Sequence, residues 1–69
     1  MAESLGNRLR EMREERGWTQ AELAARIGVS RKTINTIENR VFVPSTLIAL
    51  KLARTFELPV EQLFSISVD

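Results

Sequence analysis

The 69-residue chain contains no cysteine and no histidine, and these two absences exclude several classes of site. Without cysteine the chain forms no disulfide, and the thiolate ligands of structural zinc sites are missing. Without histidine it lacks the commonest general base and the commonest nitrogen ligand for zinc. Carboxylates are then the remaining metal ligands, and we predict neither a metal nor another cofactor.

Long apolar runs are also missing. Residues 1–15 place charged side chains between isolated apolar ones, unlike the apolar segment of a signal peptide. No run approaches the roughly 20 apolar residues that cross a bilayer, so we expect a cytoplasmic protein without a membrane segment. The chain is short enough to form one domain, predicted over residues 1–69, and too small for a small-molecule pocket.

The formal net charge of +1 hides an uneven distribution. Residues 1–25 hold four Arg and five Glu, residues 26–54 hold six Lys or Arg and one Glu, and residues 55–69 hold three acidic residues. Positive charge is therefore concentrated in the middle of the chain. A basic stretch of this size is compatible with nucleic-acid binding and equally with an ordinary solvated face.

Apolar residues recur at spacings of three and four, which predicts an all-α fold of five short helices. The predicted helices span about residues 4–16, 19–27, 30–39, 45–56 and 60–64. Apolar residues surround most of the fourth helix, which is typical of a helix at the centre of a core. The end of the chain, 64–69, alternates apolar and polar residues, as a short strand or a frayed tail does.

The second and third helices carry start and stop signals of their own. Thr19–Glu22 has the pattern of a capping box, Gly28 suits the left-handed residue that ends a helix, and Ser30 caps the next helix. Trp18 and Val29, each directly before a cap, have the spacing of a hydrophobic staple. Two tight helix entries separated by a short turn predict a helix-turn-helix unit.

The third helix has a polar outer face. At about 100° per residue, Ile34 and Ile37 point toward the core, with Glu38 at the margin. The outer positions are Arg31, Lys32, Asn35, Thr36 and Asn39. Arg and Lys match the acceptors of guanine, Asn matches adenine, and Thr bonds a base or covers a thymine methyl. Such residues also occur on plain soluble surfaces, but the helix-turn-helix context favours a DNA-reading helix.

Most of the chain resembles the Xre/Cro/C1 family of helix-turn-helix proteins. The resembling segments are Leu9–Ala24, Ile27–Asn39, Pro44–Ala53, Pro59 and Leu63–Phe64. The resemblance implies a compact five-helix domain like the DNA-binding domain of a phage repressor. It also implies a transcriptional regulator that binds double-stranded DNA sequence-specifically and is not an enzyme.

The resemblance implies roles for individual residues. Thr19 and Gln20 correspond to positions that contact phosphate, and Arg31, Lys32 and Thr36 to positions that read bases. Asn39 and Arg40, at the end of the third helix, would lie near the DNA backbone. The whole predicted DNA interface is Thr19, Gln20, Arg31, Lys32, Thr33, Asn35, Thr36, Asn39 and Arg40.

The resemblance also suggests that Arg13 pairs with Glu38. The apolar pattern agrees, because Arg13 lies beside the apolar stripe of the first helix and Glu38 beside that of the third. We interpret this pair as structural rather than catalytic. We find no pairing of nucleophile and base, and no catalytic residue is predicted.

The segment after the third helix departs from the family pattern. Arg40 stands where Gly is common, so either Asn39 closes the helix in the left-handed conformation or the turn differs. Val41–Val43 is more apolar than the basic loop often found there. We expect Phe42 in the core, and Ile48 fits either the core or a dimer contact.

Dimerisation is expected because one module of this size buries too little surface for tight, specific recognition. A homodimer would bind a palindromic operator with half-sites about 34 Å apart, and we expect a nucleoid-associated repressor. The fifth helix and an antiparallel pair of tails, with Phe64, Ile66 and Val68, form the candidate dimer surface. The alternative function is an antitoxin or co-regulator that binds a protein partner through Val41–Val43 or the tail.

Overall fold

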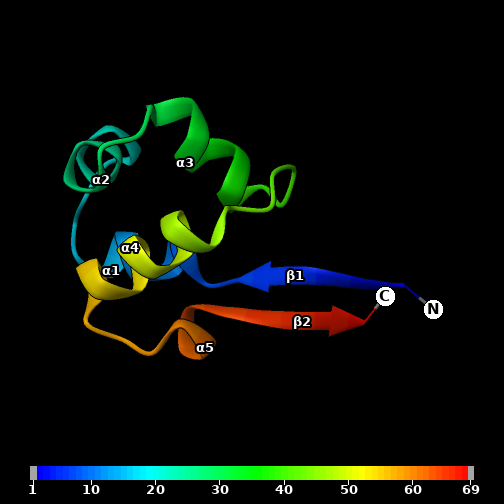
Figure 1. The fold of residues 1–69 in the computed structure, drawn as a ribbon. Helices are drawn as coiled ribbons and strands as arrows, with labels where there is room; N and C mark the ends of the chain where they lie inside the picture. The colour runs from blue at the N-terminus through cyan, green and yellow to red at the C-terminus, as the bar shows by residue number, and fades with distance from the viewer. Residues whose placement is uncertain (1, 69) are drawn as a thin grey trace.

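The computed structural model describes residues 2–68, which form five helices around one core and a two-stranded sheet beside them (Figure 1). In chain order the elements are β1 (Glu3–Asn7), α1 (Leu9–Glu15), α2 (Gln20–Ile27), α3 (Arg31–Glu38), α4 (Thr46–Phe56), α5 (Val60–Leu63) and β2 (Phe64–Val68). The predicted fold class is confirmed: a five-helix arrangement with a short C-terminal strand. Within residues 2–68, no helix has the length and apolar character needed to cross a membrane.

The core is apolar and draws on every helix and on the start of β2. Its members are Leu9, Leu23, Ala24, Ile27, Ile34, Ile37, Leu52, Phe56, Leu63 and Phe64. Trp18 and Val29 pack against this core, as the staple pattern predicts. The Trp18 ring lies 5.5 Å from the Phe56 ring, and the Arg26 guanidinium lies 4.1 Å from the Trp18 centroid. Each fully buried aliphatic side chain contributes about 1.5–3 kcal/mol, so the core supplies most of the stability.

The predicted signals at the ends of α2 and α3 are confirmed. Thr19 Oγ1 accepts a hydrogen bond from the Glu22 N–H at 3.0 Å, and the Glu22 carboxylate accepts one from the Thr19 N–H at 2.9 Å. The hydrogen bond from the Thr19 N–H, with a smaller contribution from the Thr19 side chain, lowers the pKa of Glu22. Gly28 ends α2 with φ of 76°, and Ser30 caps α3 by accepting from the Thr33 N–H. The turn between the two helices is therefore determined by its own residues.

The first helix is shorter than predicted, because residues 3–7 form β1 instead of its first turns. β1 pairs antiparallel with β2, with Glu3 opposite Val68 and Asn7 opposite Phe64. Gly6 lowers the helix propensity of this segment by about 1 kcal/mol relative to Ala. The Asn7 side chain then accepts a hydrogen bond from the Leu9 N–H at 3.0 Å, which satisfies a free donor at the start of α1.

The alternating pattern of the tail forms a strand over Phe64–Val68, and Asp69 lies outside the described residues. The sequence predicts antiparallel pairing between the tails of two chains, and β2 does not pair in this way. β2 finds its antiparallel partner in β1 of the same chain. Phe64, expected at a dimer surface, lies in the core with 8% of its surface exposed.

Two predictions about buried apolar residues were wrong. α4 is buried on one side, while Leu47 and Leu50 are 62% and 54% exposed, because so short a chain covers one face of this helix. Phe42, expected in the core, is 45% exposed. The Thr36 carbonyl accepts hydrogen bonds from the N–H groups of Val41 and Phe42, which folds this loop against the outside of α3. Ile48 packs at the margin of the core.

Candidate nucleic-acid interface

α3 is held by its inner face and exposed along its outer face. Ile34 and Ile37 are buried in the core, whereas Arg31, Lys32 and Asn39 are exposed, and Asn35 and Thr36 are half-buried. α2 and α3 lie side by side at the end of the molecule away from α5 and β2 (Figure 1). The outer face of α3 is therefore open to a large partner.

The polar groups on this outer face differ in their availability. The Thr36 hydroxyl donates to the carbonyls of Lys32 and Thr33 at 3.0 Å each, and Asn39 Nδ2 donates to the Asn35 carbonyl at 2.9 Å. Among residues 2–68, neither Arg31 nor Lys32 has a hydrogen-bond or ion-pair partner. The two cations at the start of α3 are thus free to bind an anionic or acceptor-rich partner.

The remaining predicted contact residues surround this face. Thr19 is exposed at the start of α2, while Gln20 is half-buried and donates from Nε2 to Glu38 at 3.1 Å. Arg40 follows α3 in the left-handed conformation, with φ of 61°, and donates to the Ser4 hydroxyl. Asn39 has φ of −89°, so Arg40 is the left-handed residue of this turn. Arg40 thereby ties the loop after α3 to β1.

Glu38 connects α3 to α1 and α2. Arg13 binds it through two guanidinium nitrogens, with distances of 2.7 Å to Oε2 and 3.2 Å to Oε1. The Glu38 side chain has no exposed surface, and that of Arg13 is 12% exposed. Arg13 also donates to the Trp18 carbonyl at 2.8 Å, so one guanidinium links α1, the entry to α2 and the end of α3.

The charges around Glu38 determine its protonation. Burial alone raises the pKa of Glu38, but hydrogen bonds from Arg13 and Gln20 and the positive charge of Arg13 outweigh burial, so the net pKa is lowered. Arg10 adds a further contact at 3.5 Å. The carboxylate therefore stays ionised, and its network fixes the orientation of α3.

Sequence reasoning missed the contributions of Arg10 and Gln20 to this network. Their helical positions carried a partial signal. Arg10 lies three residues before Arg13, a spacing that puts both side chains on one face of α1. The family resemblance places Gln20 at a phosphate contact, and its bond to Glu38 uses one of the two donors of its amide.

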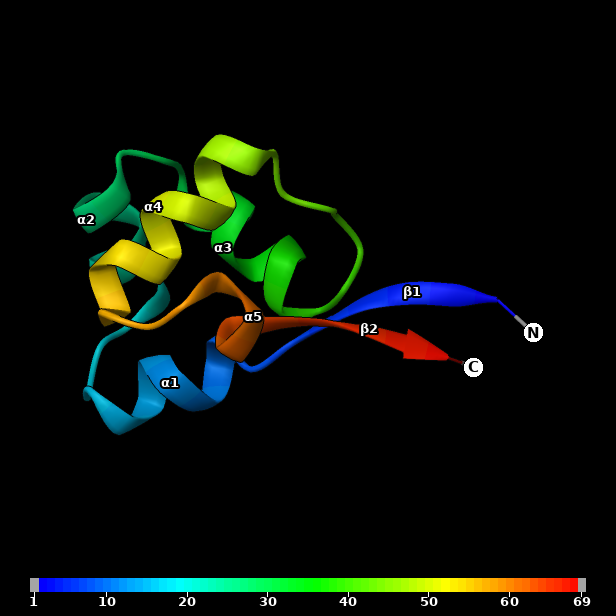
Figure 2. The same cartoon turned by 60° about the horizontal axis from the view of Figure 1, so that its bottom comes forward.

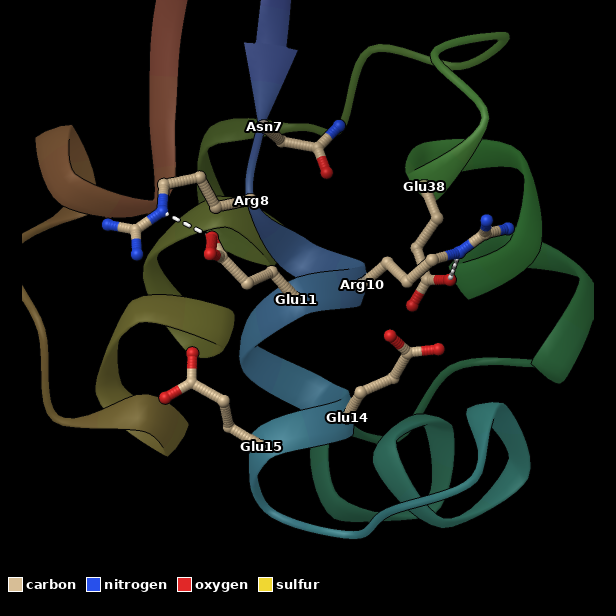
Figure 3. A pocket seen from close by; sticks show the side chains of 7 residues that line it. All are labelled: Asn7, Arg8, Arg10, Glu11, Glu14, Glu15 and Glu38. Atoms are coloured by element: carbon tan, nitrogen blue, oxygen red, sulfur yellow. Dashed lines mark hydrogen bonds and ion pairs between the residues drawn. The ribbon is translucent and has the colours of Figure 1, made fainter.

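A surface hollow beside α1 consists mainly of charged side chains. Its lining residues are Asn7, Arg8, Arg10, Glu11, Glu14, Glu15 and Glu38. Figure 3 shows Arg8 paired with Glu11 and Arg10 directed at Glu38. In the part of the chain that the structure describes, no group of three acidic residues could hold a metal ion. We assign no ligand to this hollow.

Comparisons with known proteins agree with this geometry. A family model described as Helix-turn-helix matches residues 9–63. An HTH-type transcriptional regulator of Archaeoglobus fulgidus is 46% identical over 57 residues, which cover 83% of this chain and 81% of the relative. The HTH-type transcriptional regulator YgzD of Bacillus subtilis is 38% identical over 58 residues, 84% of this chain and 88% of the relative.

A solved structure is also similar over most of its length. The restriction-modification controller protein C.AhdI from Aeromonas hydrophila has a TM-score of 0.74 and 31% sequence identity. The similarity covers 80% of this chain and 83% of that protein. The segment matched by the family model includes the capping box, the turn and α3.

Proposed function

This chain belongs to the Xre/Cro/C1-type helix-turn-helix family of DNA-binding transcription regulators, and we propose that it represses transcription as a homodimer on a palindromic operator. The family is not a class of enzymes. The observation that carries the proposal is the outer face of α3, where Arg31 and Lys32 have no partner among residues 2–68 while Ile34 and Ile37 anchor the helix in the core. We place the protein in the cytoplasm, on the nucleoid.

We assign α3 to the major groove. Arg31 and Lys32 suit guanine acceptors, and Asn35 suits an adenine edge. Thr36 contributes an acceptor and a methyl group, because its hydroxyl hydrogen is used within the helix. Half-sites about 34 Å apart would let two such helices enter successive major grooves.

Contacts to the DNA backbone then position α3. Thr19 presents the start of α2 to a phosphate, where backbone N–H groups and the helix dipole favour an anion. Gln20 keeps a second amide donor, and Arg40 keeps guanidinium donors beyond the one that binds Ser4. Asn39 and Thr33 are the remaining residues that we place beside the DNA backbone. Such contacts set the register of the protein on the duplex but carry little sequence information.

For the dimer contact we propose the sheet and the adjoining α5. Ile66 and Val68 are 71% and 58% exposed on one face of β2, and Leu5 pairs with Ile66 across the sheet. Figure 2 shows the two strands extending away from the helices. An isolated two-stranded sheet is marginally stable in water, so a second copy that covers Ile66 and Val68 would stabilise it.

Selection of duplexes from a random pool tests the DNA proposal. The wild-type chain should recover a palindromic motif at low salt and lose affinity as salt rises, because counterions are released from the DNA. The Lys32→Ala/Thr36→Ala variant should lose at least about tenfold in affinity for that motif, since each good base contact discriminates by about 1–3 kcal/mol. Affinity is measured by gel shift.

The chain offers a matched control for this variant. Lys51 and Thr55 have the same residue types at the same spacing on α4. Lys51→Ala/Thr55→Ala should therefore keep wild-type affinity. Failure to recover any bound duplex at low salt, or equal losses in the two double variants, would overturn the proposal.

One observation favours a second candidate function, an antitoxin or co-regulator that binds a protein partner. Val41 and Val43 are 78% and 69% exposed, so the loop leaves apolar surface that this chain does not cover. Lys32→Ala/Thr36→Ala separates the two functions. It should weaken specific DNA binding by the same factor of at least about tenfold and leave a protein contact made through Val43 intact, because Val43 lines a different hollow from Lys32 and Thr36.

A further inference from the structure

A second surface hollow lies between the outer face of α3 and the loop that follows it. Its walls are Ser30, Lys32, Thr33, Thr36, Val41 and Phe42. The loop reaches this position because Arg40 adopts the left-handed conformation and the N–H groups of Val41 and Phe42 bond the Thr36 carbonyl, at 2.9 and 3.2 Å. The hollow is therefore continuous with the face of α3 assigned to DNA.

The walls of this hollow are mostly apolar. The Thr36 hydroxyl donates to backbone carbonyls of α3, and the hydroxyls of Thr33 and Ser30 bond each other at 3.0 Å. One hydroxyl hydrogen of the Ser30 and Thr33 pair remains, and most of the other surface that these residues offer a ligand is methyl and methylene. Val41 and Phe42, which are 78% and 45% exposed, add an aliphatic group and an aromatic ring.

We propose that this hollow holds the C5-methyl group of a thymine in the major groove, which makes Val41 and Phe42 specificity-determining residues. The inference rests on the proposed function. The thymine methyl is the apolar feature among base edges in that groove. The polar edges of the same base pair would then lie within reach of Lys32, which lines the hollow beside the loop.

The charge of Lys32 favours a duplex over an apolar protein segment as the occupant. Lys32 is exposed, unpaired within residues 2–68, and part of the wall. A protein side chain that filled the hollow would cover this ammonium group without a partner, which is unfavourable. A duplex brings phosphates and base acceptors to it.

Replacement of thymine by deoxyuracil tests the proposal, since it removes the methyl group and leaves the hydrogen-bonding edge unchanged. In the motif recovered by selection, each thymine is replaced in turn and the affinity of the full chain is measured. At one thymine per half-site, the wild-type chain should bind the uracil duplex about fourfold more weakly, the loss expected for one buried methyl-sized group.

Variants of the loop assign this effect to the hollow. Phe42→Ala should bind the thymine and uracil duplexes equally well, and Phe42→Leu, which keeps an apolar wall, should restore a preference for thymine. Val43→Ala is the matched control, because Val43 belongs to the same loop, is 69% exposed and lines a different hollow. It should keep the wild-type ratio.

The possible failures are distinguishable. If the wild-type chain binds no duplex, the proposed function and this inference both fail. If it binds a duplex but thymine and uracil are equivalent at every position, the thymine assignment fails and the proposed function stands. The thymine assignment also fails, with the proposed function intact, if Phe42→Ala keeps the fourfold preference. It fails likewise if a protein partner binds this loop and replacement of Phe42 leaves the affinity for DNA unchanged.

Discussion

α2 and α3 are neighbours along the chain, whereas β1 and β2 come from its two ends. The helices are separated by residues 28–30 and each begins at a side-chain cap, while the strands pair residues as far apart as Glu3 and Val68. The helices bury Leu23, Ile34 and other core residues, but the sheet leaves Ile66 and Val68 exposed. The helical region is held by its own contacts, whereas the sheet leaves apolar side chains exposed, and we propose that a second copy covers them.

This difference matches the two tasks that we propose. A helix that reads bases must present its side chains at a fixed angle, and the Glu38 network together with the core holds α3 in this way. A dimer contact needs an apolar area that is exposed in the monomer, which Ile66 and Val68 provide. Substitutions in the helical region and in the sheet should therefore have different effects.

Glu38→Gln should destabilise the helical region most. It leaves the Arg13 guanidinium, 12% exposed, without its charged partner. Loss of one member of a buried pair costs about 3–5 kcal/mol, and the remaining exposure of Arg13 places the expected loss near the lower end. Urea unfolding followed by circular dichroism measures it. Glu15→Gln, at an exposed carboxylate on α1 outside the Glu38 network, is the control and should change the stability little.

The effect of Glu38 should depend on pH with a defined sign. Its pKa is lowered in the folded chain, so the stabilisation is fully present above the unfolded value of about 4.3 and is lost as pH falls through the lower folded value. The difference in unfolding free energy between wild type and Glu38→Gln should therefore narrow below about pH 4. A difference that grows toward acid would contradict this assignment. Glu22, whose pKa is also lowered, leaves some pH dependence in both proteins.

Thr19→Ala should cost about 1 kcal/mol of unfolding free energy, because it removes the side-chain acceptor of the capping box at α2. Thr46→Ala is a matched control, since Thr46 begins α4 but Ser45 supplies the cap there. Thermal unfolding measures the loss of stability in each of the two variants relative to wild type. Equal losses would show that the start of α2 depends on other contacts than the Thr19 cap.

Ile66→Ser should barely affect the monomer, with a change in unfolding free energy below about 0.5 kcal/mol, because Ile66 is 71% exposed. It should raise the dissociation constant of the dimer about tenfold or more, since an aliphatic side chain buried in the contact is lost from both copies. Sedimentation measures the dissociation constant of the dimer, and urea unfolding measures the stability of the monomer. Ser65→Ala, on the opposite face of β2, is the control, and an unchanged dimer in Ile66→Ser would rule out this face as the dimer contact.

The elements predictable from the sequence are those whose signals lie within a few residues of one another. The capping box at Thr19, the left-handed Gly28 and the buried pair Ile34 and Ile37 depend on local spacing, and the structure has them as predicted. β1 depends on a partner strand about sixty residues away, and its Leu5 also has the spacing to Leu9 and Met12 that predicts one apolar stripe of a helix. Pairing over such a distance leaves no local pattern to detect.

The candidate site shows the same limit. The outward position of Lys32 follows from helical periodicity, and its exposure agrees. Periodicity could not place Phe42, because its position results from the left-handed Arg40 and from hydrogen bonds to the Thr36 carbonyl. It also could not tell which apolar side of α4 is covered, since that depends on how the other helices pack.

An NMR titration of the isotopically labelled chain with the selected duplex tests the central claim most directly, because it observes both regions at once. We expect the backbone amide signals of residues 30–42 and of the start of α2 to shift on binding, while those of β1 and β2 stay near their positions in the free protein. Shifts confined to β1 and β2, with the signals of α3 unchanged, would contradict it.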